Sequence, residues 1–200
     1  DFSRDDRVWP GDPQQFAEDG TGLAHGVAGV VYALSLVGRE PDERGLAWID
    51  AVWERPGDPR RPHRAGLWDG LAGLAWLHRR LGRRAHAQAA LERLRRLDFS
   101  SLGSDLYGGL PGVGLVLLEA SDDDPTLVLE ALEIGGILRS RHDARQPIPT
   151  APEDRRVATG SGGLLRGPSG TALFALRLYE RTGEPAHLRL AQDALDYDLA

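Results

Sequence analysis

The chain has 200 residues and a mass of 21.7 kDa, and its 41% hydrophobic and 27% charged residues are typical of a globular domain with a sizeable core. Its 24 basic and 30 acidic residues leave a net charge of −6, whereas a nucleic-acid-binding domain carries the opposite excess. No apolar run approaches a membrane span, and the absence of cysteine excludes disulfides, thiolate metal ligands and a cysteine nucleophile from these residues.

Two expectations follow from what the sequence lacks. The first residues have no apolar core of the kind found in a signal peptide, so we expect a cytoplasmic protein. The sequence also contains no methionine, so we expect it to be an internal stretch of a longer polypeptide.

Four similar glycine-rich segments recur along the chain. They read GLAHGVAG, GLWDGLAG, DLYGGLPG and GLLRGPSG, and they begin near residues 22, 66, 105 and 163. The shared frame is G-L-x-x-G-x-x-G, with Asp105 in place of the first glycine in the third copy. Starts about 40 to 60 residues apart fit helical hairpins with their loops, so residues 1–200 are expected to be part of one repeat domain.

Each segment is followed by an apolar stretch and then by a more amphipathic one, which predicts two helices per repeat. Gly38, Gly82 and Gly183 are expected to end three of the apolar helices.

The amphipathic stretches predict the second helix of each repeat. In RRAHAQAALERLRRLD, we expect Ala85, Ala89 and Leu94 to form one apolar stripe. Pro125 and Pro185 mark the expected starts of two further helices.

An insertion rich in Pro, Gly and charge, at about 141–162, is expected to be a surface loop. No segment of useful length alternates as a strand does, so the expected fold class is all-α.

The G-x-x-G pairs have a mechanical explanation, because glycine can adopt a positive φ and lets two backbones approach closely. The residue before each pair is His25, Asp69, Gly108 or Arg166. If the apolar helices run parallel around a ring, these positions converge at one end. Free N–H groups at the helix starts would favour anionic ligands there. Alternatively, the glycines only shape the turns.

The repeated frame, the opening DRVWPGDPQQF and the stretch GLLRGPSGTALFALRLYERTGEPAHLRLA together resemble the cyclase domain of lanthionine synthetases. The closest likeness is to the LanC-like domain of the class III (LanKC) and class IV enzymes, and it spans nearly the whole chain. The resemblance implies an α/α toroid of about seven helical hairpins, of which this chain would cover the first four.

The resemblance also implies a chemistry. In such enzymes, kinase-like and lyase domains phosphorylate and dehydrate Ser and Thr of a precursor peptide. The cyclase domain then adds cysteine thiols to dehydroalanine or dehydrobutyrine, giving lanthionine or labionin rings. The implied partners are a precursor peptide and the kinase-like and lyase domains, with ATP or GTP used only by the kinase domain outside this segment. We expect no cofactor in these residues, and zinc only if its ligands lie beyond Ala200.

Asp105 and Arg166 are the main catalytic candidates. Asp105 matches the third repeat, where the cyclases that the chain resembles carry an important acidic residue, although it could simply cap the turn. Arg166 occupies the place of a histidine in zinc-dependent relatives. It could stabilise an enolate oxygen or bind a carboxylate or phosphate of the precursor peptide, or form a structural salt bridge.

His25 is a third catalytic candidate, and Asp69 and Tyr107 are candidates for substrate binding. A structural histidine at position 25 and a capping carboxylate at position 69 are the competing interpretations. Two other functions stay open: a non-catalytic peptide-binding toroid, and an α/α-toroid glycoside hydrolase that uses Asp69 and Asp105 as its two carboxylates.

Overall fold

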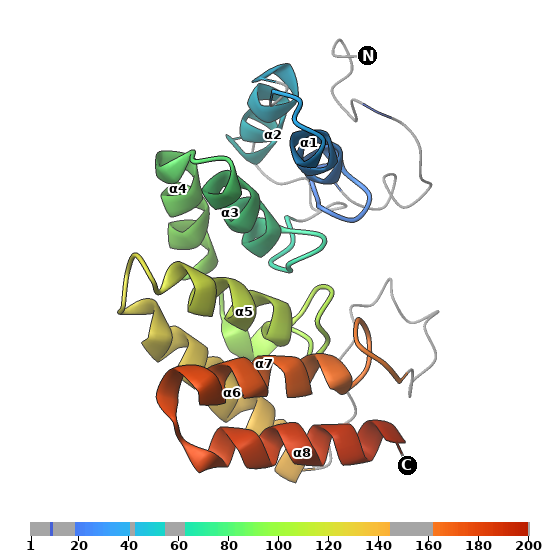
Figure 1. Ribbon diagram of the computed structural model, residues 1–200, viewed down its shortest axis with the longest axis vertical. Coiled ribbons are helices and arrows are strands. Elements are labelled where there is room, and N and C mark those ends of the chain that lie inside the picture. Colours follow the sequence, from blue (N-terminus) through green and yellow to red (C-terminus); the bar gives the residue numbers. More distant parts are fainter. Residues whose placement is uncertain (1–8, 10–18, 41–42, 55–62, 145–161, 200) are drawn as a thin grey trace. The chain divides into compact units, whose positions relative to one another are not determined.

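The computed structural model describes residues 9, 19–40, 43–54, 63–144 and 162–199, and within these ranges every regular element is helical (Figure 1). The elements are α1 (Val27–Leu36), α2 (Glu43–Glu54), α3 (Leu71–Arg80), α4 (Arg84–Leu94), the 3₁₀ helix η2 (Phe99–Ser101), α5 (Leu110–Ala120), α6 (Leu127–Asp143), α7 (Ser169–Thr182) and α8 (Pro185–Leu199). The all-α fold class is therefore confirmed for this part of the chain. None of the described helices is both long and apolar enough to cross a bilayer.

The chain divides into two compact units, Asp1–Leu97 and Asp98–Ala200. In the first unit α1 packs against α2 and α3, and α3 packs against α4. In the second unit α5 packs against α6 and α7, and α7 packs against α8. Each unit thus contains two helical hairpins whose leading helices (α1 and α3, or α5 and α7) contact each other, as Figure 1 shows for α5 and α7. We call α2, α4, α6 and α8 the return helices.

Glycines at the starts of three leading helices permit a close backbone approach. Gly26, Gly70 and Gly109 have φ of −121°, −157° and −110°, so the expected positive φ is wrong at these positions. The close approach is real, because a Cβ on Gly26 would lie only 2.5 Å from the carbonyl oxygen of Gly20. A side chain at Gly70 or Gly109 would overlap the carbonyl of Arg64 or Gly103 even more severely.

The expected glycine stops are confirmed. Gly38, Gly82 and Gly183 have φ of +74°, +71° and +70°, in the left-handed region where only glycine avoids steric strain. Each follows its leading helix by one or two residues. The chain therefore changes direction within a residue or two of the end of the leading helix. This turn allows the return helix to pack against the leading helix before it.

The return helix α4 buries a different stripe from the one expected. Its buried residues are Ala87, Ala90, Leu91 and Leu94, spaced i, i+3, i+4 and i+7 on one face. Ala85 and Ala89 are exposed, so only Leu94 of the expected stripe is correct. The error arose because alanine alone carries too little hydrophobic signal to set the phase of the helix.

Two helix starts and one helix end refine the expected boundaries. α8 begins at Pro185 as expected, whereas α6 begins at Leu127 because the Asp124 carboxylate first accepts hydrogen bonds from the Thr126 N–H and hydroxyl. α6 also continues to Asp143, past the expected start of the insertion at about 141. Residues 145–161 of that insertion lie outside the described residues.

Candidate functional site

All four glycine-rich segments share a bend, three turn residues and a second bend before the leading helix, and in the fourth segment Pro168 adds one turn residue before α7. Within each unit, the two segments are joined by an equivalent hydrogen bond. The N–H of Ala24 donates to the carbonyl of Trp68 at 2.9 Å, and the N–H of Tyr107 donates to the carbonyl of Leu165 at 3.1 Å. Donor and acceptor are the third residue of their segments in both pairs, so the turns meet in the same register.

The first amides of the leading helices are bonded to the preceding loop. The N–H groups of Val27, Leu71 and Leu110 donate to carbonyl oxygens seven residues upstream, at 2.9, 2.9 and 2.8 Å. These amides are the ones that would otherwise be left without a helical acceptor. The expectation that such helix starts offer free N–H groups to an anion is therefore wrong at these three positions, because the loop backbone takes them first.

The structure brings together three of the predicted site residues, Asp105, Tyr107 and Arg166. The Cζ of Arg166 lies 3.9 Å from the centroid of the Tyr107 ring. Its Nη1 lies 3.9 Å from the Asp105 Oδ1, at the long end of an ion pair. The residues come from adjacent turns that the hydrogen bond from Tyr107 to Leu165 holds in register. The sequence named each of these residues as a candidate but did not predict this contact, because they occupy the first, third and fourth places of their segments.

The three side chains differ in how far they are exposed to solvent. Asp105 and Tyr107 are only 4% and 6% exposed, whereas the Arg166 side chain is 23% exposed and reaches solvent. The Oδ1 of Asp105 also accepts the Gly108 N–H at 2.9 Å, so the carboxylate does cap its turn. Arginine keeps its proton near neutral pH and presents five N–H donors. The cluster can thus offer a fixed cation to an oxygen that gains negative charge.

The remaining predicted site residues, His25 and Asp69, lie in the first unit. Asp69 is 4% exposed, and its Oδ2 accepts a hydrogen bond from Nη1 of Arg64 at 3.0 Å. This ion pair agrees with the interpretation of Asp69 as a structural residue of its turn. His25 is partly exposed on the first turn. Roles of both residues in catalysis or substrate binding remain predictions.

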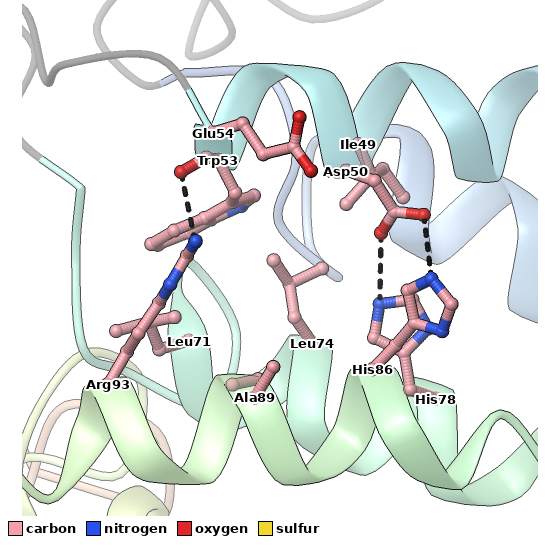
Figure 2. Close-up of a pocket in the computed structure, with 11 residues that line it drawn as sticks. Ile49, Asp50, Trp53, Glu54, Leu71, Leu74, His78, His86, Ala89 and Arg93 are labelled. Carbon is pink, nitrogen blue, oxygen red and sulfur yellow. Dashed lines mark hydrogen bonds and ion pairs between the residues drawn. The ribbon is translucent and has the colours of Figure 1, made fainter.

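A pocket that the sequence did not indicate lies between α2, α3 and α4 (Figure 2). Its volume is about 220 Å³, and apolar side chains of Ile49, Trp53, Leu71 and Leu74 line much of it. The guanidinium of Arg93 closes one side by donating to the Trp53 carbonyl at 2.9 Å. The sequence gives no sign of this pocket because its lining is spread over three helices and forms no local motif.

A polar cluster around Asp50 lies at one end of this pocket (Figure 2). Asp50 Oδ2 lies 2.9 Å from Nη2 of Arg83 and 3.3 Å from Nε2 of His86, and its Oδ1 lies 3.7 Å from Nε2 of His78. Arg83 Nη1 is 3.2 Å from Nδ1 of His78. Because arginine only donates, Nδ1 accepts and the neutral His78 ring carries its proton on Nε2.

Burial, reinforced by the nearby Arg83 charge, lowers the pKa of His78 from 6.5 to about 4. His78 is therefore neutral near neutral pH. In the part of the chain that the structure describes, no group of three or more His, Cys, Asp or Glu side chains could hold a metal ion. The Asp50 cluster is thus a hydrogen-bonded polar network that links three helices.

The fold and this geometry define a class: over its described residues, the protein consists of paired helical hairpins whose glycine-rich turns carry a cluster of polar side chains. No family model matches the chain. The chain is 44% identical, over 202 aligned residues, to a probable SapB synthase of Streptomyces coelicolor. The alignment covers 99% of this chain and 21% of that protein, so the chain spans about a fifth of the length of this relative.

Proposed function

We propose that this chain belongs to the cyclase domain of a lanthipeptide synthetase and assists the addition of cysteine thiols to dehydroalanine or dehydrobutyrine. The similarity to a probable SapB synthase supports a role in lanthipeptide biosynthesis. The four glycine-rich segments support the cyclase assignment, because they resemble those of LanC-like domains of the class III and class IV enzymes. The observation that carries the proposal is the convergence of Asp105, Tyr107 and Arg166 from two of these segments.

The proposed architecture is an α/α toroid of which these hairpins form one part. The equivalent bonds of Ala24 and Tyr107 to the next turn favour a repeated arrangement in which leading helices follow one another. The end of α1 presents exposed apolar side chains, since Leu34 is 36% exposed and Val37, directly after the helix, is 72% exposed. Such side chains call for a packing partner, and further hairpins of a closed ring would supply it.

Thioether formation requires removal of the thiol proton, stabilisation of an enolate and delivery of a proton to carbon. In the proposed reaction, the Asp105 carboxylate takes the proton from the cysteine thiol as sulfur attacks the β-carbon. The π electrons move to the carbonyl oxygen, and the N–H groups of Arg166 stabilise the resulting enolate. The proton then returns from Asp105 to the α-carbon, so that no external reactant is consumed.

Tyr107 holds the Arg166 guanidinium through its ring face and contributes to the surface on which the peptide binds. His25 and Asp69 complete the proposal as an acid–base candidate and a peptide-binding candidate from the first unit. The described residues do not provide the cysteine and histidine donor set that the resemblance associates with zinc, and the proposed steps use only this chain's own side chains. Kinase-like and lyase domains that use ATP or GTP would lie elsewhere in the full-length protein.

One observation favours a second candidate function, a peptide-binding toroid without catalysis. Arg166 is already stacked on Tyr107 and cannot act as an acid near neutral pH, unlike the histidine that the resemblance implies at this place in zinc-dependent cyclases. A glycoside hydrolase has less support, because Asp69 is paired with Arg64 in the first unit and Asp105 caps its turn in the second.

The test uses the full-length protein that contains this chain and a synthetic peptide with one dehydroalanine and one cysteine. Loss of the free thiol, followed by alkylation and mass spectrometry against an enzyme-free control, measures cyclisation. Asp105→Asn should lower the rate by about 100-fold, and Asp193→Asn, an exposed position on α8, should not. An inactive wild-type protein would favour the binding function, and an unaffected Asp105→Asn variant would remove Asp105 from the mechanism.

A further inference from the structure

The end of each return helix in the second unit lies beside the turn that starts its own hairpin. On α6, Arg141 reaches the loop before the third segment. Its Nη1 donates to the Leu102 carbonyl at 2.8 Å and to the Ser104 hydroxyl at 2.9 Å, and its Nη2 donates to the Ser100 carbonyl at 2.7 Å. One guanidinium thereby fixes three acceptors within the five residues that lead to Asp105.

On α8, Asp198 holds the fourth segment in a corresponding way. Both of its carboxylate oxygens lie 2.9 Å from the N–H of Gly163, and Oδ2 accepts a short hydrogen bond from the Ser169 hydroxyl. These bonds, led by the one from Ser169, lower the pKa of Asp198. Gly163 and Ser169 flank Arg166, so one carboxylate fixes the turn on both sides of this residue.

The charges of Arg141 and Asp198 are complementary to the backbone groups that each side chain contacts. Arg141 meets carbonyl oxygens, whereas Asp198 meets an N–H group. The first unit has a related contact without charge, in which Nε1 of Trp53 near the end of α2 donates to the Thr21 hydroxyl at 3.1 Å. Thr21 and Ser104 both directly precede the first residue of their segments, so the contact recurs at an equivalent place.

We propose that Arg141 and Asp198 are positioning residues that hold the turns of Asp105 and Arg166 and thereby set the distance between the carboxylate and the guanidinium. Neither residue needs to touch the peptide. Thr171 reinforces the arrangement, because its hydroxyl donates to the Ser104 carbonyl at 3.2 Å and ties the start of α7 to the loop that Arg141 holds. The catalytic consequence rests on the proposed function, but the structural one does not.

The structural test is hydrogen–deuterium exchange on the full-length protein. Arg141→Ala should speed exchange in residues 100–109, and Asp198→Ala should speed it in residues 163–169, while residues 20–28 of the first unit stay unchanged. The matched controls are Arg189→Ala and Asp196→Ala, two exposed positions on α8. Unchanged exchange in the two turns would overturn the proposal. If an alanine variant unfolds globally, Arg141→Lys and Asp198→Asn are measured in its place.

The functional test uses the dehydroalanine–cysteine peptide. Arg141→Ala and Asp198→Ala should displace a group that acts in the transition state. Each should therefore lower kcat by about 10- to 100-fold and leave KM nearly unchanged. Arg141→Lys should restore only part of the rate, since an ammonium cannot span three acceptors in a fork. Faster exchange with wild-type kcat would overturn the positioning role. A wild-type protein without cyclase activity would instead defeat the proposed function, and the exchange result would still decide whether the two residues hold the turns.

Discussion

Arg166 lies over the ring of Tyr107, with 3.9 Å between the guanidinium carbon and the ring centroid, although 58 residues separate the starts of the segments that carry them. The ring face attracts the cation and leaves the N–H groups at its edge able to donate. This arrangement orients a partly exposed arginine through a ring face in addition to its ion pair with Asp105. A group that must meet developing negative charge benefits from being fixed beforehand.

The first prediction concerns this stacked pair. Tyr107→Leu removes the ring face and should lower the stability of the protein and, under the proposed function, its cyclisation rate, whereas Tyr107→Phe keeps the face and should lower both less than Tyr107→Leu does. A double-mutant cycle with Arg166→Gln isolates the interaction from lost packing. We expect a coupling free energy of about 0.5–1 kcal/mol from unfolding measurements. Strictly additive effects of the two substitutions would show that the stacking is incidental.

The sequence predicted the four turns and the helix stops because glycine is required there by local geometry. The left-handed φ of Gly38 and the close backbone approach at Gly26 each leave a visible glycine in the sequence. The sequence singled out Asp105, Tyr107 and Arg166 one by one, as candidates in the third and fourth segments. Their contact depends on the third and fourth turns lying side by side, because the three residues occupy the first, third and fourth places of their segments and are not equivalent in the repeat.

Features that depend on packing between helices could not be predicted. Asp50, His78 and His86 come from three helices, and only the approach of α2 to α3 and α4 brings them together. The bonding of the Val27 amide to Gly20 depends on the path of the loop, for which the sequence has no periodic signal. Arg141 and Asp198 were missed for the same reason, since each looks like an ordinary polar residue near a helix end.

The second prediction concerns the pH dependence of stability. The pKa of His78 is about 4 in the folded protein and 6.5 in the unfolded chain, so the unfolded state takes up a proton first as the pH falls. The contribution of neutral His78 is therefore complete above about pH 6.5 and is lost progressively down to about pH 4. Burial also lowers the pKa of His187, which acts in the same direction.

Thermal unfolding between pH 8 and pH 4 checks this prediction. His78→Phe removes the titrating ring and should reduce the fall in midpoint temperature relative to the wild type. An unchanged slope in the His78→Phe variant would mean that acid destabilisation arises at other groups.

The third prediction compares two glycines that look alike in the sequence. A Cβ at Gly70 would overlap the backbone of Arg64, which cannot move without breaking its hydrogen bond to the Leu71 N–H, so Gly70→Ala should destabilise the protein by about 2–4 kcal/mol. Gly136 lies within α6, and a methyl group at this position would have no neighbouring atom within 4 Å, so Gly136→Ala should stabilise the protein by about 0.5–1 kcal/mol. Denaturant unfolding measures both. A Gly70→Ala variant as stable as the wild type would show that the turn can open, and the glycine would then not be required by the close approach of the two backbones.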